Sequence, residues 1–101
     1  MALILSTDGT QAELSPLTID SAMRVVGGVL EVIEVSNDKY LLVHEEGKLI
    51  GLPLNLQASA MLPDDCIVGP AVLCSASELG LDAEDRGSAL VGHGSIRILT
   101  L

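Results

Sequence analysis

The sequence predicts a small α+β fold: a mostly antiparallel sheet with two short helices on one face, for which a β-grasp-like arrangement is one layout. Three observations lead to this prediction. Short apolar runs rich in β-branched residues are separated by turn residues, which is typical of strands joined by hairpins. Two short segments carry helix start and stop residues. The length of 101 residues corresponds to one domain, residues 1–101.

The first predicted elements are a hairpin and a helix. Two short runs, Ala2 to Ser6 and Gln11 to Leu14, flank the turn signal Asp8-Gly9. Ser15-Pro16 is expected to start the helix, because a hydroxyl cap followed by Pro is favoured there. Gly27-Gly28 is expected to end it, because Gly adopts the left-handed cap conformation at least cost. Apolar residues recur at helical spacing between them, at Ile19, Ala22, Met23 and Val26.

A second hairpin is predicted from Val29 to Val35 and from Lys39 to Glu45, with Ser36-Asn37-Asp38 as its turn. Alternation along its second strand places Leu41 and Val43 on one face. The other face takes Tyr40, Leu42 and His44. A short strand from Leu49 to Leu52 is expected to follow, ending at Pro53.

Asn55 is predicted to cap a second helix over Leu56 to Leu62. Cys66 to Cys74 is the longest β-like run, in which Gly69-Pro70 is expected to introduce a bulge, a bend or an edge. Residues 75–101 are predicted to form an acidic loop or short helix followed by a last strand from Ile96 to Leu101.

The charge of the chain limits its partners. Fourteen acidic residues against five Lys and Arg give a net charge of −9, which argues against direct binding to nucleic acid or to anionic membranes. A cationic protein partner remains compatible with it. No apolar run reaches the length of a membrane span, and no signal peptide is evident. Cys66 and Cys74 are too far apart in one strand for a disulfide, so we expect reduced thiols and a cytoplasmic location.

Three residues are candidates for a ligand pocket: His44, Asn55 and Gly69. Helix capping is the simpler interpretation of Asn55. His44 with Glu45 and Glu46 is an unconvincing metal site, because adjacent strand residues point to opposite faces. No Ser or Cys has a local His partner in a nucleophilic arrangement. The sequence therefore predicts no catalytic residue, metal or cofactor.

The densest acidic stretch contains Asp82, Glu84 and Asp85, with Glu78 nearby. A solvated loop is the default interpretation of such a stretch. The alternative is an anionic surface that imitates nucleic-acid phosphates and inhibits a DNA-binding enzyme, which requires carboxylates at phosphate-like intervals.

Several segments occur in an order that characterises one family. They are Val26-Gly27-Gly28, Leu30-Glu31-Val32, His44-Glu45-Glu46-Gly47-Lys48-Leu49, Gly51-Leu52-Pro53-Leu54-Asn55 and Ile67-Val68-Gly69-Pro70. Over about Met1 to Cys74 the chain resembles a family of bacterial, phage and mobile-element proteins known as domain of unknown function 3846. The resemblance implies an α+β fold, an intracellular setting and a viral or mobile-element origin, and it supplies no catalytic residues.

These observations together favour a non-enzymatic accessory or interaction domain. A homodimer, formed through an exposed strand edge or an aliphatic patch, is one assembly the sequence allows. Two alternatives remain open: the nucleic-acid mimic, and a small-ligand binder or enzyme with a pocket near Asn55.

Overall fold

The computed structural model describes residues 2–36, 38–62, 65–78 and, for the backbone, 95–98. Within these residues, six strands and two helices follow one another along the chain. They are β1 (Ala2–Leu5), β2 (Gln11–Leu14), α1 (Ile19–Val26), β3 (Leu30–Ser36), β4 (Lys39–His44), α2 (Leu56–Ser59), β5 (Ala71–Ser75) and β6 (Ser95–Ile98). The predicted small α+β fold and both predicted hairpins are confirmed.

The strands form one sheet in the order β2-β1-β5-β4-β3-β6, and every described pairing is antiparallel. Strand β4 lies in the interior of this sheet, and its residues Tyr40 to Val43 are buried. A β-grasp sheet has a parallel pair at its centre, so the β-grasp-like layout is wrong for this chain.

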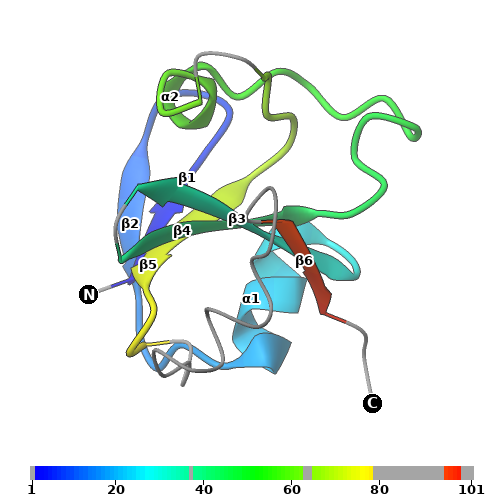
Figure 1. The fold of residues 1–101 in the computed structure, drawn as a ribbon. Coiled ribbons are helices and arrows are strands. Elements are labelled where there is room, and N and C mark those ends of the chain that lie inside the picture. The colour runs from blue at the N-terminus through cyan, green and yellow to red at the C-terminus, as the bar shows by residue number, and fades with distance from the viewer. Residues whose placement is uncertain (1, 37, 63–64, 79–94, 99–101) are drawn as a thin grey trace.

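The two helices cover opposite faces of the sheet, so their predicted placement on one face is wrong (Figure 1). On one face, Ala22 and Val26 of α1 pack with Tyr40 and Leu42 of β4, in a cluster we call the α1-side core. On the other face, Ala58 of α2 packs in the α2-side core, which comprises Leu5, Leu41, Val43, Ala58, Ile67 and Ala71. The reason lies in β4, because its adjacent apolar residues point to opposite faces of the sheet. Both faces are therefore apolar, and each must be packed against other residues to be shielded from water.

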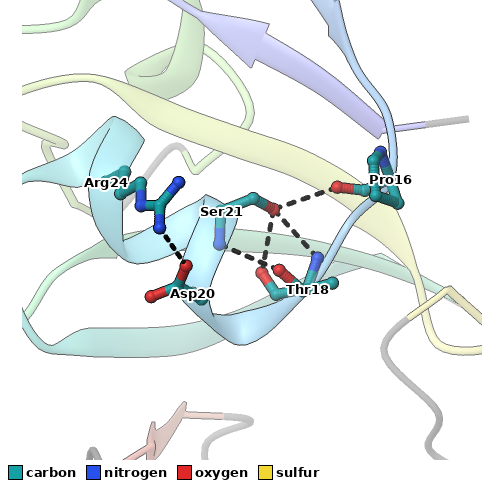
Figure 2. Close-up of polar contacts among 5 residues, drawn as sticks. All are labelled: Pro16, Thr18, Asp20, Ser21 and Arg24. Carbon is teal, nitrogen blue, oxygen red and sulfur yellow. Dashed lines mark hydrogen bonds and ion pairs between the residues drawn. The ribbon is translucent and has the colours of Figure 1, made fainter.

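Helix α1 begins later than predicted, at the N-cap Thr18 instead of Ser15-Pro16 (Figure 2). The Thr18 hydroxyl accepts a hydrogen bond from the backbone N–H of Ser21 at 2.9 Å, and the Ser21 hydroxyl accepts one from the backbone N–H of Thr18 at 2.9 Å. This reciprocal pair satisfies two donors that a bare helix end leaves open. The Ser21 hydroxyl also donates to the carbonyl of Pro16 at 3.0 Å, which places Pro16 in the turn before the helix. The helix ends as predicted, with Gly27 at φ 88°.

The segment after β4 is a loop and not the predicted strand from Leu49 to Leu52. Its backbone closes on itself, because the N–H of Ile50 donates to Glu46 at 3.0 Å and that of Leu52 donates to Gly47 at 3.0 Å. The run from Cys66 is also less regular than expected, since β5 begins only at Ala71. The predicted bend is present at Gly69, which has φ 77°.

Tyr40 is completely buried in the α1-side core, and its hydroxyl has no hydrogen-bond partner among the described residues. A buried hydroxyl without a partner opposes folding, because it loses its hydrogen bonds to water. We therefore expect Tyr40→Phe to leave the free energy of unfolding unchanged or to raise it by up to about 1 kcal/mol. Urea titration measures this difference. A loss of stability on this substitution would show that the hydroxyl is paired in the folded protein.

Candidate functional site

A groove of about 600 Å³ opens on the α2 side of the sheet, beside the ends of β3 and β4. Val43 and Ile67 line it from the α2-side core, and Ile33 and Leu62 are half-buried beside them. The loop after β4 contributes Leu49, whose side chain is 84% exposed. The groove therefore combines apolar side chains from the strands, from the loop and from the segment after α2.

Charged residues surround these apolar side chains. Among the described residues, four carboxylate residues line the groove, namely Glu31, Glu34, Glu45 and Asp65. Lys48 is the lysine among the described lining residues, and its Nζ forms an ion pair with Asp65 Oδ1 at 2.7 Å. The hydrogen bond from Lys48 holds the pKa of Asp65 below its ordinary value, and the same bond raises the pKa of Lys48. The ion pair ties the loop after β4 to the segment after α2.

His44 is the predicted pocket residue that lines the groove. Its Nδ1 accepts a hydrogen bond from the backbone N–H of Glu46 at 2.9 Å, which helps to start the loop after β4. Its Nε2 lies against Gly28, where an added Cβ would come within 2.5 Å of it. His44 therefore positions the loop against the start of β3.

Asn55 and Gly69 lie together, and neither is among the described residues that line the groove. The Asn55 side chain is fully buried, and its Nδ2 donates to the carbonyls of Leu5 at 2.8 Å and Gly69 at 2.9 Å. Its Oδ1 accepts from the N–H of Ala58 at 3.1 Å, so it caps α2 as predicted. All three hydrogen-bond partners of the Asn55 side chain are backbone atoms of this chain, so its side chain links separate segments of the fold. The predicted partner residues Asp82, Glu84 and Asp85 lie outside the described residues.

Exposed aliphatic side chains are concentrated in the loop after β4 and the first residue of α2, a segment that we call the apolar loop. Four of the five large hydrophobic residues exposed in the described part of the chain belong to it: Leu49, Ile50, Leu54 and Leu56, which are 84, 57, 47 and 72% exposed. Figure 1 shows this loop extending away from the sheet. These residues include the segment from Leu49 to Leu52, which was predicted to be a short strand and is a loop. The signal that identifies it is the flanking of Leu49 and Ile50 by Gly47, Gly51 and Pro53.

The sequence matches one known protein family over most of its length. The family described as Domain of unknown function (DUF3846) matches residues 1–85. The chain belongs to the DUF3846 family. The match extends beyond Cys74, where the resemblance found in the sequence stopped, and it includes the groove and the apolar loop. This DUF3846 chain matches no curated protein and no solved structure.

A metal-binding cluster and a membrane-spanning helix are two features that the described residues of this DUF3846 chain lack. No cluster of three His, Cys, Asp or Glu residues among them is placed to hold a metal ion. None of the described helices has the length and apolar character needed to cross a bilayer. Both cysteines are free thiols.

The two thiols are expected to differ in reactivity, because the thiolate is the reactive form. Cys66 is exposed at the groove, whereas Cys74 is buried in the α1-side core. Burial, together with the nearby Glu78 carboxylate, raises the pKa of Cys74 to about 12. We expect a thiol reagent at neutral pH to label Cys66 alone in the folded protein and both thiols in urea. Rapid labelling of Cys74 in the folded protein, read by mass spectrometry, would contradict this packing.

Proposed function

We propose that this protein is a non-enzymatic interaction domain that contacts a partner protein through the apolar loop. The observation that carries the proposal is the concentration of exposed aliphatic side chains at Leu49, Ile50, Leu54 and Leu56. Covering one such side chain contributes roughly 1.5–3 kcal/mol. Large apolar groups that a chain leaves in water at one place are typical of protein contact sites.

The apolar loop is held in place before any partner arrives. The backbone N–H of Asn55 donates to Ile67 at 2.8 Å, and that of Gly69 donates to Pro53 at 2.7 Å. The ion pair between Lys48 and Asp65 adds a second attachment. A preorganised loop loses little conformational freedom on binding, so more of the contact energy appears as affinity.

The nucleic-acid mimic receives no specific support from the described residues. Exposed carboxylates such as Asp8, Asp20 and Asp38 lie on different turns and helices, and Asp20 is paired with Arg24 at 2.7 Å (Figure 2). Self-association through the apolar loop is opposed by the charge of −9 on each copy. A partner protein of different composition is therefore the favoured occupant.

The proposal is tested by comparing proteins that co-purify with the tagged chain from its host cells. We expect the double variant Leu49→Ser, Ile50→Ser to lose at least about tenfold of the bound partner, since two exposed aliphatic contacts are removed. The matched control is Ile19→Ser, because Ile19 is also exposed, at 51%, but lies on α1 across the sheet. Thermal melting confirms that both variants remain folded. Equal recovery of the partner with both variants, or no partner with the wild type, would contradict the proposal.

A further inference from the structure

We infer that His44 makes the apolar loop responsive to pH: the neutral imidazole holds the start of the loop, and protonation of the ring releases it. The inference rests on the proposed function, because it names how the same contact site is regulated. Its starting point is the hydrogen bond in which the backbone N–H of Glu46 donates to Nδ1 of His44 at 2.9 Å. Only a ring nitrogen without a proton accepts such a bond.

This hydrogen bond lies where the sheet passes into the loop. His44 is the last residue of β4, and the N–H of Glu45 still pairs with the carbonyl of Val29 at 2.9 Å. Glu46 is bonded on both sides, because its N–H donates to His44 and its carbonyl accepts from the N–H of Ile50 at 3.0 Å. Ile50 is one of the exposed aliphatic residues of the apolar loop. The His44 ring is therefore connected to the contact site through a single residue.

The ring of His44 is confined on its other side by Gly28, which follows α1. A Cβ added at Gly28 would lie 2.5 Å from Nε2 and 3.0 Å from Cδ2, so the ring lies directly against the backbone. A proton on Nδ1 would place two N–H donors face to face, and the ring has little room to move away from Glu46. Glu46 is exposed. The start of the loop is therefore the part that has to move.

The ionisable groups around His44 leave the response to the ring. Carboxyl, thiol and ammonium groups ordinarily titrate near about pH 4, 8.5 and 10.4, outside the range of about 5 to 8 in which histidine changes charge. The Lys48–Asp65 hydrogen bond lowers the pKa of Asp65 and raises that of Lys48, so this attachment persists through the range. On α1, Asp20 and Arg24 pair with each other at 2.7 Å. The ionisable residues that line the groove with His44, together with its neighbour in the loop, are Glu31, Glu34, Glu45, Lys48, Asp65, Cys66 and Glu46.

The sign of the effect follows from the form of His44 that makes the bond. The neutral ring accepts the Glu46 N–H, so the bond is present at high pH and is lost as the pH falls. The loss of one such hydrogen bond changes an equilibrium by about three- to tenfold. A loop that is held less firmly loses more conformational freedom on binding. Acidification should therefore weaken the contact with the partner.

The first experiment follows the whole chain by NMR from about pH 8 to about pH 5, the range in which histidine titrates. We expect Nδ1 of His44 to carry no proton at the upper limit, and the Glu46 amide to titrate with the same midpoint as the His44 ring. The protection of the Ile50 amide against hydrogen exchange, corrected for the intrinsic rate, should fall about threefold or more. A Glu46 amide that does not follow the ring, or constant protection of Ile50, would overturn the inference.

A matched pair of variants assigns the response to one histidine. His44→Asn supplies a side-chain oxygen that accepts the N–H two residues on at every pH, so the loop should lose its pH dependence. His93→Asn removes the other histidine of the chain, which lies outside the described residues, and should leave the response unchanged. A response that persists in His44→Asn or disappears in His93→Asn contradicts the role of His44. Circular dichroism confirms that both variants are folded, and the wild-type titration decides the question without them.

The failure of this inference is distinguishable from the failure of the proposed function. We expect the partner from host cells to dissociate about threefold faster near about pH 5.5 than near about pH 7.5 from the wild type, and equally fast from His44→Asn. If the partner depends on Leu49 and Ile50 but the Glu46 amide does not follow His44, the inference is wrong and the proposed function stands. If the loop follows His44 but the partner does not depend on Leu49 and Ile50, the proposed function is wrong and the pH response of the loop stands.

Discussion

Replacing Asn55 with alanine is expected to lower the free energy of unfolding by about 3–5 kcal/mol. The Asn55 side chain is fully buried and makes three hydrogen bonds, to Leu5, Gly69 and Ala58. Truncation removes the partner of two carbonyls and of one N–H in a place that water does not reach. Each buried group left without a partner costs about 1–3 kcal/mol. Urea titration at neutral pH measures the difference.

Gln57 provides the control for this prediction. It is also an amide on α2, and its Nε2 donates to the carbonyls of Ser6 at 2.9 Å and Thr10 at 2.8 Å. Because Gln57 is half-exposed, water replaces the lost bonds, and Gln57→Ala should cost at most about 1 kcal/mol. Similar losses for the two variants would contradict the role of Asn55 as the buried link between α2, β1 and the segment before β5.

Leu41→Ala and Leu42→Ala should each destabilise the protein by about 2–5 kcal/mol, although the two residues are neighbours on β4. Leu41 is 0% exposed in the α2-side core, and Leu42 is 1% exposed in the α1-side core. Each truncation removes apolar contacts and leaves a cavity on a different face of the sheet. Two large losses are expected only if both faces are covered.

The control for the core variants is Leu56→Ala on α2. Leu56 is 72% exposed, so its truncation should change the free energy of unfolding by no more than about 0.5 kcal/mol. Denaturant titration of the three variants gives the comparison. A large loss for only one of Leu41 and Leu42 would support a sheet with a single covered face and would contradict the two-core arrangement.

Local signals predicted much of the fold. The turn at Asp8-Gly9, the alternation along β4 and the cap at Gly27 are encoded by neighbouring residues, and the structure confirms them. The capping role of Asn55 was predicted for the same reason. Its hydrogen bonds to Leu5 and Gly69 were not predicted. Their carbonyls belong to residues 50 and 14 positions away, and no local sequence pattern indicates such a pairing.

Features that depend on long-range packing escaped prediction. The placement of α1 and α2 on opposite faces depends on how the helices return to the sheet, which no local pattern records. The groove is built from β3, β4, the apolar loop and the segment after α2, so its residues converge only in the folded chain. The strand predicted from Leu49 to Leu52 was wrong, because a short hydrophobic run between turn residues fits an exposed loop as well as a strand, and Leu49 and Ile50 are both exposed.

The central claim is that the apolar loop contacts a partner protein, and site-specific photocrosslinking in the host cell tests it most directly. A photoreactive residue is placed at Leu49 in one version of the chain and at Ile19 in another, since both positions are exposed and lie on opposite sides of the sheet. We predict a covalent adduct heavier than the 10.5 kDa chain from the Leu49 position and none from Ile19. The absence of an adduct from Leu49, or equal adducts from the two positions, would contradict the claim.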